Sequence, residues 1–261
     1  MMRMLLHAAT ERGTLELAEL DAAIAAPLPI SRRIAMLGIA GGVGTSVVAG
    51  RTAAVIAARR EGHVLLVDAD GRGVPAAWHA GALGDAYGLA AAIDPTDEAG
   101  DIRLLSLDGE QPSTSVWWAA ASERQRASAL SISDWGAPSR GRTQEIVALS
   151  HVAVVVARGN RADAQRALDL ATQIESTGDC LAAIALVDAD GTAPPAMQTL
   201  ASLMPVPTVV LPHDRAHAQS RHVPLHRLRD ASALALLRLA ALTVQRASHS
   251  SGSSRMGGRS A

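Results

Sequence analysis

Residues 38–50, GIAGGVGTSVVAG, place four glycines within seven residues, between an apolar run and a stretch of helical periodicity. In such a turn, successive backbone N–H groups converge on an anion, and the N-terminus of the following helix adds partial positive charge. The pattern therefore predicts a loop that holds phosphate groups through its backbone. The alternative is a tight strand-to-helix turn that needs glycine only for packing. The residues expected to contact a nucleotide here are Gly41, Gly42, Val43, Gly44, Thr45 and Ser46.

Acidic residues end two of the apolar runs that follow this loop. Asp68 and Asp70 close the segment HVLLVDAD, and Asp134 closes ALSISD. Because the carboxyl ends of parallel strands lie along one edge of a sheet, we expect these carboxylates near the loop. Carboxylates placed in this way could hold a cation through water or position an attacking water. The alternative is that these aspartates only cap or anchor loops.

Lysine is absent from the chain, so all 24 basic residues are arginines. The position that carries lysine in most phosphate-binding loops holds Thr45, and a hydroxyl cannot replace an ammonium group beside transferring phosphoryl oxygens. Losing a preorganised charge at the transition state costs on the order of 3 kcal/mol, a roughly hundredfold drop in rate. Binding suffers less, because the backbone and Mg²⁺ still neutralise phosphate. Arg72, Arg140 and Arg142 are candidates for a substitute phosphate clamp.

The glycine spacing also fits the dinucleotide loop of short-chain dehydrogenases, with Asp68 near a ribose hydroxyl. That class transfers protons with a Tyr-x-x-x-Lys pair. The chain has one tyrosine, Tyr87, and no lysine. It also lacks the G-x-S-x-G motif of serine hydrolases. A dehydrogenase and a serine hydrolase are therefore both disfavoured.

Histidines and arginines gather in residues 213–229. Pro224 interrupts any helix that would align the histidines, and no cysteine accompanies them, so no zinc site is expected. The arginines form a modest basic patch, but aromatic side chains that stack on bases are missing, so DNA binding is the less favoured prediction. The residues concerned are His213, His217, His222 and His226, and Arg215, Arg221, Arg227 and Arg229.

Seven apolar runs alternate with helical patterns along the chain. The runs are residues 33–40, 63–70, 102–107, 129–134, 152–158, 182–188 and 208–212, and the clearest helical patterns are 45–60, 161–176 and 195–204. Unbroken apolar strands that alternate with helices predict a mostly parallel central sheet with helices on both faces. We therefore expect a single α/β domain over residues 31–247. A helical lead-in (1–30) precedes it, and a Ser/Gly-rich disordered tail (248–261) follows.

The bulk composition is that of a globular protein. Of the 261 residues, 48% are hydrophobic and 19% charged, which supports a sizeable core. The formal net charge of -1 gives no general attraction to nucleic acid or anionic lipid. A single cysteine, Cys180, excludes an intramolecular disulfide and favours a cytoplasmic location. No run approaches the roughly 20 apolar residues of a membrane span. The last helical pattern lacks the basic face and bulky aromatics of interfacial helices, so peripheral membrane contact is not expected.

An ordered series of segments over residues 33–247 resembles the ParA/MinD family of deviant Walker A P-loop ATPases. The segment AGGVGTSV (40–47) is similar to the family loop K-G-G-x-G-K-T-[ST], EGHVLLVDADGRG to its second strand and switch segment, and ALSISDWGAPS to its Walker B strand. The resemblance implies a P-loop NTPase-like fold for this domain, with ATP or ADP and Mg²⁺ as the cofactor. It makes Ser46, Asp68 and Asp134 the candidate Mg²⁺ site, and Asp70 and Asp134 the candidate catalytic groups if the protein hydrolyses a nucleotide. It also implies that the base lies near the ends of the later strands, beside Asp188, Pro212 and Asp214.

Two subgroups of the family are similar in more detail. The TadZ/CpaE pilus-assembly proteins have loops such as G-G-V-G-[AS]-T-T, and actinobacterial MinD-like proteins associated with type VII secretion have ends similar to LPHD…PLHRLRD. Both loop lysines of the family are replaced here, by Ala40 and Thr45. We therefore predict a regulatory or scaffolding pseudo-ATPase in positioning, partitioning or secretion and pilus assembly. A slow Mg²⁺-dependent ATPase and a nucleotide-free interaction module are the alternatives. A protein partner in a larger assembly is expected, and the family's sandwich dimer makes a homodimer a further expectation.

Overall fold

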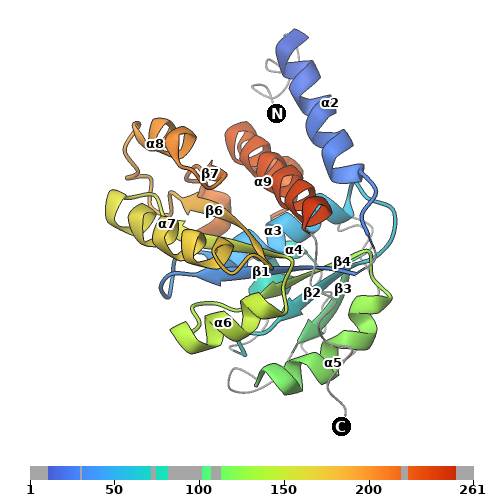
Figure 1. The fold of residues 1–261 in the computed structure, drawn as a ribbon. Helices are drawn as coiled ribbons and strands as arrows, with labels where there is room; N and C mark the ends of the chain where they lie inside the picture. Colours follow the sequence, from blue (N-terminus) through green and yellow to red (C-terminus); the bar gives the residue numbers. More distant parts are fainter. Residues whose placement is uncertain are drawn as a thin grey trace.

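The computed structural model describes residues 11–29, 31–71, 75–81, 102–106, 113–218 and 223–250. Within these ranges, seven strands form one parallel sheet in the order β3-β2-β4-β1-β5-β6-β7 (Figure 1). The strands are β1 (Arg32–Gly38), β2 (Val64–Asp68), β3 (Ile102–Ser106), β4 (Leu130–Asp134), β5 (Val152–Arg158), β6 (Leu181–Val187) and β7 (Thr208–Leu211). Each coincides with one of the seven predicted apolar runs, and the predicted fold class is confirmed.

Several sequence predictions concern residues outside these ranges. They are the start of the helical lead-in (1–10), Arg72, Tyr87, Arg221, His222 and most of the predicted tail (251–261).

Helices cover both faces of the sheet. One face carries α3 (Thr45–Ala57), α4 (Pro75–Ala80) and α9 (Asp230–His249). The other carries α5 (Thr114–Arg126), α6 (Arg140–Ala148), α7 (Arg161–Glu175) and α8 (Met197–Leu203). Two 3₁₀ turns, η1 (Arg215–Ala218) and η2 (Leu225–Arg227), lie between β7 and α9. The ends of α3 and α7 match the predicted helical patterns to within three residues.

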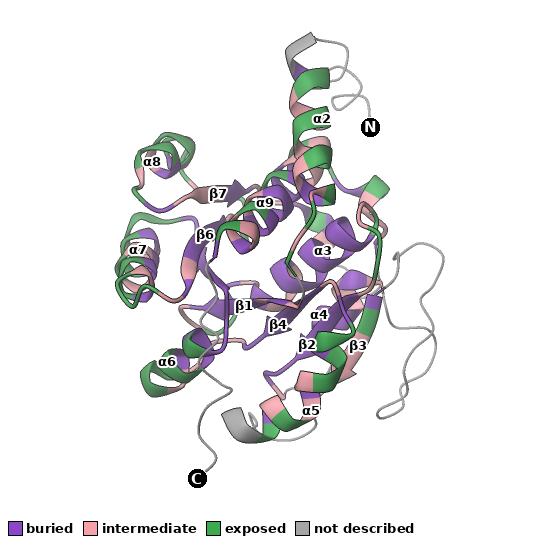
Figure 2. Cartoon of the chain, turned by 45° about the vertical axis from the view of Figure 1, so that its right-hand side comes forward, coloured by how far each residue is buried: buried purple, intermediate pink, exposed green. Residues whose placement is uncertain are grey.

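The central strands are buried on both faces (Figure 2). In β1, Ile34 and Met36 point into the core under α3 and α9, whereas Ala35 and Leu37 point into the core on the opposite face. None of the four is more than 1% exposed. Because both faces of the sheet are covered, the strand sequences are continuously apolar and do not alternate between apolar and polar residues.

Helix α2 (Glu11–Ala25) packs against α9, on the side of α9 that faces away from the sheet (Figure 1). The Nε of Arg238 on α9 donates to Glu16 Oε1 at 2.7 Å, and the Nε of Arg59 donates to Asp21 Oδ1 at 2.8 Å. Ile24 at the end of α2 is fully buried. Helix α9 therefore has packed neighbours on two sides. None of the described helices combines the length and apolar character needed to cross a bilayer.

Candidate functional site

The glycine-rich loop runs from the end of β1 to the start of α3. The N–H of Gly38 donates to the Gly136 carbonyl at 2.6 Å and the N–H of Ile39 donates to the Val156 carbonyl at 3.0 Å, so the loop is anchored between β4 and β5. Gly42 and Gly44 have φ angles of 72° and 95°, in the left-handed region that favours glycine. Gly44 is also the residue that precedes the first turn of α3. The loop therefore has the backbone form and the position that phosphate binding at a helix N-terminus requires.

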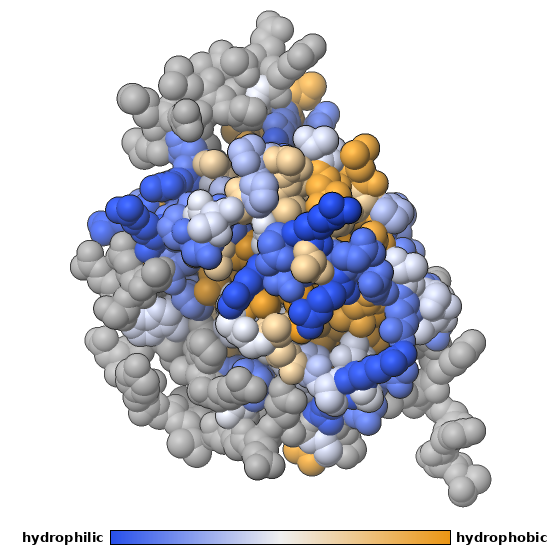
Figure 3. Space-filling model, turned by 90° about the vertical axis from the view of Figure 1, so that its left-hand side faces the viewer, coloured by the Kyte–Doolittle hydropathy of each residue, from blue (hydrophilic) through white to orange (hydrophobic). Residues whose placement is uncertain are grey.

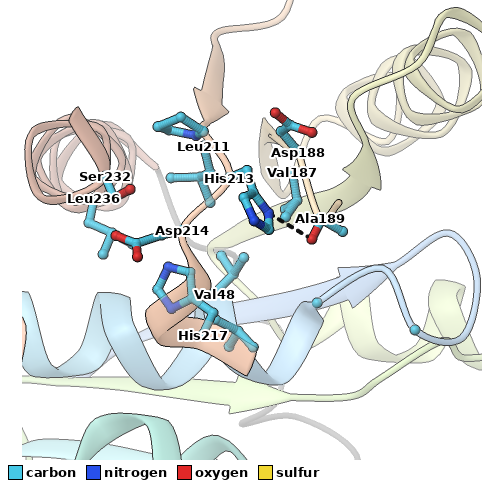
Figure 4. A pocket seen from close by; sticks show the side chains of 14 residues that line it. Val48, Val187, Asp188, Ala189, Leu211, His213, Asp214, His217, Ser232 and Leu236 are labelled. Atoms are coloured by element: carbon cyan, nitrogen blue, oxygen red, sulfur yellow. Dashed lines mark hydrogen bonds between the residues drawn. The ribbon is translucent and has the colours of Figure 1, made fainter. Parts of the chain in front are cut away.

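A pocket of about 180 Å³ opens beside this loop, between α3, α9 and the carboxyl ends of β6 and β7 (Figure 4). It contains five of the residues predicted to bind nucleotide, namely Gly42, Gly44, Asp188, Pro212 and Asp214. Apolar side chains supply most of the remaining wall, from Val47 and Val48 on α3 to Leu236 on α9. Segments that are about 170 residues apart in the sequence thus meet at one cavity.

The two predicted base-side aspartates use their carboxylates within the protein. Asp188 Oδ1 accepts hydrogen bonds from the N–H groups of Gly191 at 2.9 Å and Ala193 at 3.1 Å, which shapes the loop after β6. Asp214 accepts from the N–H groups of Ala216 at 3.0 Å and Arg229 at 2.8 Å. Burial raises the pKa of Asp214, but these bonds, together with the Ser232 hydroxyl and the His217 side chain, lower it overall. Both residues therefore act on the pocket chiefly by fixing the backbone that lines it.

A buried cation lies behind the pocket. Arg51 on α3 is 1% exposed, and its guanidinium donates to the Val223 carbonyl. Burial lowers the pKa of Arg51 to about 10, and the charge of Asp214 partly offsets this effect. His217, which lines the pocket, has its pKa lowered to about 4 by burial and then by the charge of Arg51. The imidazole is therefore neutral at pH 7, and the charge in this region belongs to Arg51 and Asp214.

The three predicted acidic residues cluster on the other side of the loop, at the ends of β2 and β4. Asp68 and Asp134 are register partners on adjacent strands, and both are fully buried. The Asp70 carboxylate lies against Gly136, where a side chain would collide with it. Burial and then the charge of Asp134 raise the pKa of Asp68 to about 7. Burial also raises the pKa of Asp134, although the nearby Ser46 hydroxyl and the Gly136 N–H favour its charged form.

These carboxylates fit a cation. The N–H groups of Asp70 and Gly71 lie near Asp68, but neither oxygen of Asp68 has a hydrogen bond of good geometry within the described residues, and nor does Oδ2 of Asp134. Buried, unpaired carboxylate oxygens need positive charge, and Mg²⁺ takes oxygen ligands. No cluster of three or more His, Cys, Asp or Glu side chains with metal-binding geometry is found in the described part of the chain. The side chains alone are therefore an incomplete metal site, and Mg²⁺ held by Ser46, Asp134 and Asp68 would need water or phosphate oxygens as further ligands.

Thr45, which replaces the usual lysine, turns its hydroxyl inward. The residue is 6% exposed, and a side chain at Gly38 would collide with its Oγ1. Its hydroxyl thus occupies the space between the loop and the end of β1. Of the arginines considered as a substitute clamp, Arg142 covers the Trp135 ring at 5.3 Å and lies 3.5 Å from Glu145. Arg140 is exposed at the first turn of α6.

The histidines and arginines of residues 213–229 occupy separate environments in the described segments. The Nδ1 of His213 lies 3.0 Å from the Ala189 carbonyl, and His217 faces Arg51 as described. His226 and Arg227 are exposed in η2.

Sequence reasoning missed the apolar part of the site. Val48, Leu211 and Leu236 line the pocket, but in the sequence they are ordinary members of apolar runs. The sequence could have marked Arg51 as unusual, because it is the one charged residue in α3, whose other residues are small or apolar. Its burial depends on contacts with Val223 and Asp214, which are more than 160 residues away in the chain and which local sequence does not reveal.

Comparisons with known proteins bear on the fold. No protein-family model matches the sequence, and no curated protein is similar to it in sequence. Among solved structures, the septum site-determining protein MinD complexed with Mg-ADP from Pyrococcus horikoshii matches with a TM-score of 0.63 at 16% identity, over 80% of this chain and 94% of that one. The MinC:MinD cell division complex from Aquifex aeolicus gives 0.59 at 14% identity, with coverages of 80% and 94%. A putative plasmid partition protein from Borrelia burgdorferi bound to AMPPNP gives 0.57 at 12% identity, with coverages of 82% and 99%.

These matches define the class of fold. The chain has the α/β P-loop NTPase fold in the form found in MinD and plasmid-partition proteins. At these identities the likeness concerns the fold alone, and the site residues have to be argued from this chain.

Proposed function

We propose that this protein is a nucleotide-binding member of the ParA/MinD family with a degenerate phosphate loop, and that it binds ATP or ADP with Mg²⁺. The observation that carries the proposal is the pocket that joins Gly42 and Gly44 to Asp188, Pro212 and Asp214. In an open parallel sheet, ligands bind outside the carboxyl ends of the strands, and this pocket lies at the carboxyl ends of β6 and β7, beside the loop that follows β1. The Mg-ADP of the Pyrococcus horikoshii protein and the AMPPNP of the Borrelia protein support the choice of ligand.

We place the protein's role in regulation or scaffolding, not in rapid hydrolysis. With Ala40 and Thr45 in the loop, no loop ammonium group can meet a transferring phosphoryl group. The activity would belong to a positioning or partitioning system, or to secretion or pilus assembly as in the TadZ/CpaE and type VII secretion-associated subgroups. The MinC:MinD complex supports a protein partner by analogy. A homodimer and a cytoplasmic location belong to the same proposal, and DNA is the less favoured partner.

Two observations favour the alternatives. The pair of Asp134 and Ser46, with Asp68 and Asp70 close by, preserves groups that a slow Mg²⁺-dependent ATPase would use. The pocket of about 180 Å³ is smaller than the roughly 300 Å³ at which ligand pockets begin. The small volume favours a nucleotide-free interaction module unless the loop opens on binding.

Calorimetric titration with ATP and with ADP, each with Mg²⁺, tests the proposal. The matched variants are Gly44→Ala and Gly62→Ala, because both glycines have positive φ and an added methyl meets its nearest atom at 3.7 Å and 3.6 Å. Both variants carry the same kind of backbone strain, but only Gly44 belongs to the loop. We expect Gly44→Ala to weaken nucleotide binding and Gly62→Ala to preserve it.

Two results would redirect the proposal. No heat and no thermal shift with millimolar nucleotide would leave only the interaction module. Steady phosphate release that Asp134→Ala abolishes would establish the slow ATPase in place of the scaffold.

A further inference from the structure

Arg158, the last residue of β5, stands beside the phosphate loop. Its Nη2 atom lies 3.8 Å from the position that a Cβ on Gly42 would occupy. The residue is exposed, whereas the six β5 residues before it are buried. The exposed position lies on the face of the molecule that carries the carboxyl ends of the strands. Hydrophilic side chains cross the middle of that face, and apolar patches show between them (Figure 3).

The register of the sheet explains why Arg158 meets the loop. On β5, Val152, Val154 and Val156 face the core under α3 and α9, and Arg158 continues this alternation. Its register partner on β6 is Val187, whose Cγ1 lies 3.7 Å from the Cβ position of Gly44. Two neighbouring side chains of the sheet therefore lie against the two left-handed glycines of the loop. Val187 lines the pocket, and Arg158 places a positive charge beside Gly42, which also lines it.

The guanidinium of Arg158 forms no ion pair with any of the described residues. No hydrogen bond or ion pair within 4 Å joins it to a carboxylate there. The Asp190 carboxylate accepts from the Thr192 hydroxyl and from the Thr192 N–H at 3.1 Å, and these bonds lower its pKa, with a smaller contribution from the charge of Arg158. Arg166, the other arginine at the loop, is partly neutralised, because it contacts Asp163 at 3.2 Å as well as the Ile39 carbonyl at 3.4 Å.

We propose that Arg158 supplies, from β5, the side-chain charge that binds the phosphate groups of a nucleoside di- or triphosphate, in place of the missing loop lysine. This inference rests on the proposed nucleotide-binding function. Arginine suits the task because its planar guanidinium presents several N–H donors and forms bidentate bonds with phosphate. The loop has lost its own cation, and the adjacent strand provides one at the same glycines.

The test compares four proteins by calorimetric titration: wild type, Arg158→Ala, Arg158→Lys and Arg161→Ala. Arg161 is the matched control, because it is an exposed arginine three residues further along the chain. The ligands are Mg-ATP, Mg-ADP and adenosine. We expect Arg158→Ala to weaken Mg-ATP and Mg-ADP binding about tenfold or more and to leave adenosine binding unchanged, since charge-assisted bonds are lost only from the phosphates. Arg158→Lys should recover part of the loss, and Arg161→Ala should change binding less than about twofold.

The titrations distinguish a failure of the role proposed for Arg158 from a failure of the proposed nucleotide-binding function. If Arg158→Ala binds Mg-ATP as the wild type does, or if Arg161→Ala loses as much affinity, the role of Arg158 is refuted and the nucleotide site stands. If the wild type binds none of the three ligands, the proposed function falls and this inference falls with it. A thermal melt of each variant checks folding, and an exposed side chain at a strand end should leave the midpoint unchanged.

Discussion

The buried pair Asp68 and Asp134 should reduce the stability of the folded protein at neutral pH. Both side chains are fully buried at register-paired positions, and neither oxygen of Asp68 has a hydrogen bond of good geometry within the described residues. Replacing Asp68 by Asn keeps the shape of the side chain and removes one of the two charges. We therefore expect Asp68→Asn to be more stable than the wild type at pH 8.

The size of the effect follows from the pKa of Asp68, which burial and the charge of Asp134 raise from 3.8 to about 7. Below pH 4 the carboxyl is protonated in both the folded and unfolded states and contributes nothing. As the pH rises, the unfolded state loses the proton first, so the free energy of unfolding falls until the folded group ionises near pH 7. At about 1.36 kcal/mol per pKa unit, the full penalty above pH 7 is about 4 kcal/mol. About 3 kcal/mol of it develops between pH 5 and pH 8.

Urea unfolding of wild type and Asp68→Asn at pH 5 and pH 8, in EDTA to exclude divalent cations, measures this difference. The control is Asp169→Asn, because Asp169 is exposed on α7. The advantage of Asp68→Asn should grow by about 3 kcal/mol between the two pH values, while Asp169→Asn stays within about 0.5 kcal/mol of the wild type. An advantage that does not change with pH, or a variant less stable than the wild type at pH 8, would refute the reasoning.

Three further predictions concern other parts of the structure. Gly50→Ala should destabilise the protein by about 1–3 kcal/mol in urea melts, because its methyl would collide with the Ala76 carbonyl on α4, whereas Gly141→Ala, with open space around it, should be neutral or stabilising. Thr45→Lys should raise ATP turnover at least tenfold in a phosphate-release assay if the loop binds nucleotide as proposed, and an unchanged rate would count against that placement. The ring of His151 should stay neutral from pH 8 to pH 5 in an NMR titration, because burial and the charges of Arg33 and Arg32 lower its pKa to about 3. Because the unfolded state takes up the proton first, the stabilisation from neutral His151 should be lost as the pH falls from about 6.5 toward 3. A titration midpoint of His151 above pH 5 would contradict the lowered pKa.

The sequence was sufficient for the fold because the strands are buried on both faces. Strands such as β1 and β5 are apolar over their whole length, so each predicted run could be placed to within a few residues. The Gly-rich loop could also be predicted from the sequence, because Gly42 and Gly44 adopt left-handed backbone angles that other residues avoid. In both cases the signal is local: it depends on the residues of one segment and their immediate backbone.

The site was predictable only in part, since its walls are made by contacts between distant segments. The family resemblance predicted that Asp188, Pro212 and Asp214 lie near the loop. It did not predict that the carboxylates of Asp188 and Asp214 accept hydrogen bonds from the backbone of their own turns. The sequence pointed to Arg72, Arg140 and Arg142 as candidate cations, and Arg72 lies outside the described residues. The guanidinium that the structure places beside Gly42 belongs to Arg158. Which arginine reaches the loop depends on the register between β5 and β6 and on the side to which each side chain projects, and neither follows from composition or spacing.

The packing of α2 on α9 also constrains the order in which the chain can fold. The contact between Glu16 and Arg238 joins residues 222 positions apart. During synthesis α2 emerges before the seven described strands, with Leu17 and Leu20 uncovered, and its partner helix α9 emerges only after them. The strands of the sheet are all synthesised before α9, but the contact between α2 and α9 cannot form until α9 has been made. The packing of α2 on α9 is therefore a long-range event that follows the synthesis of the seven described strands, and until then Leu17 and Leu20 lack this cover.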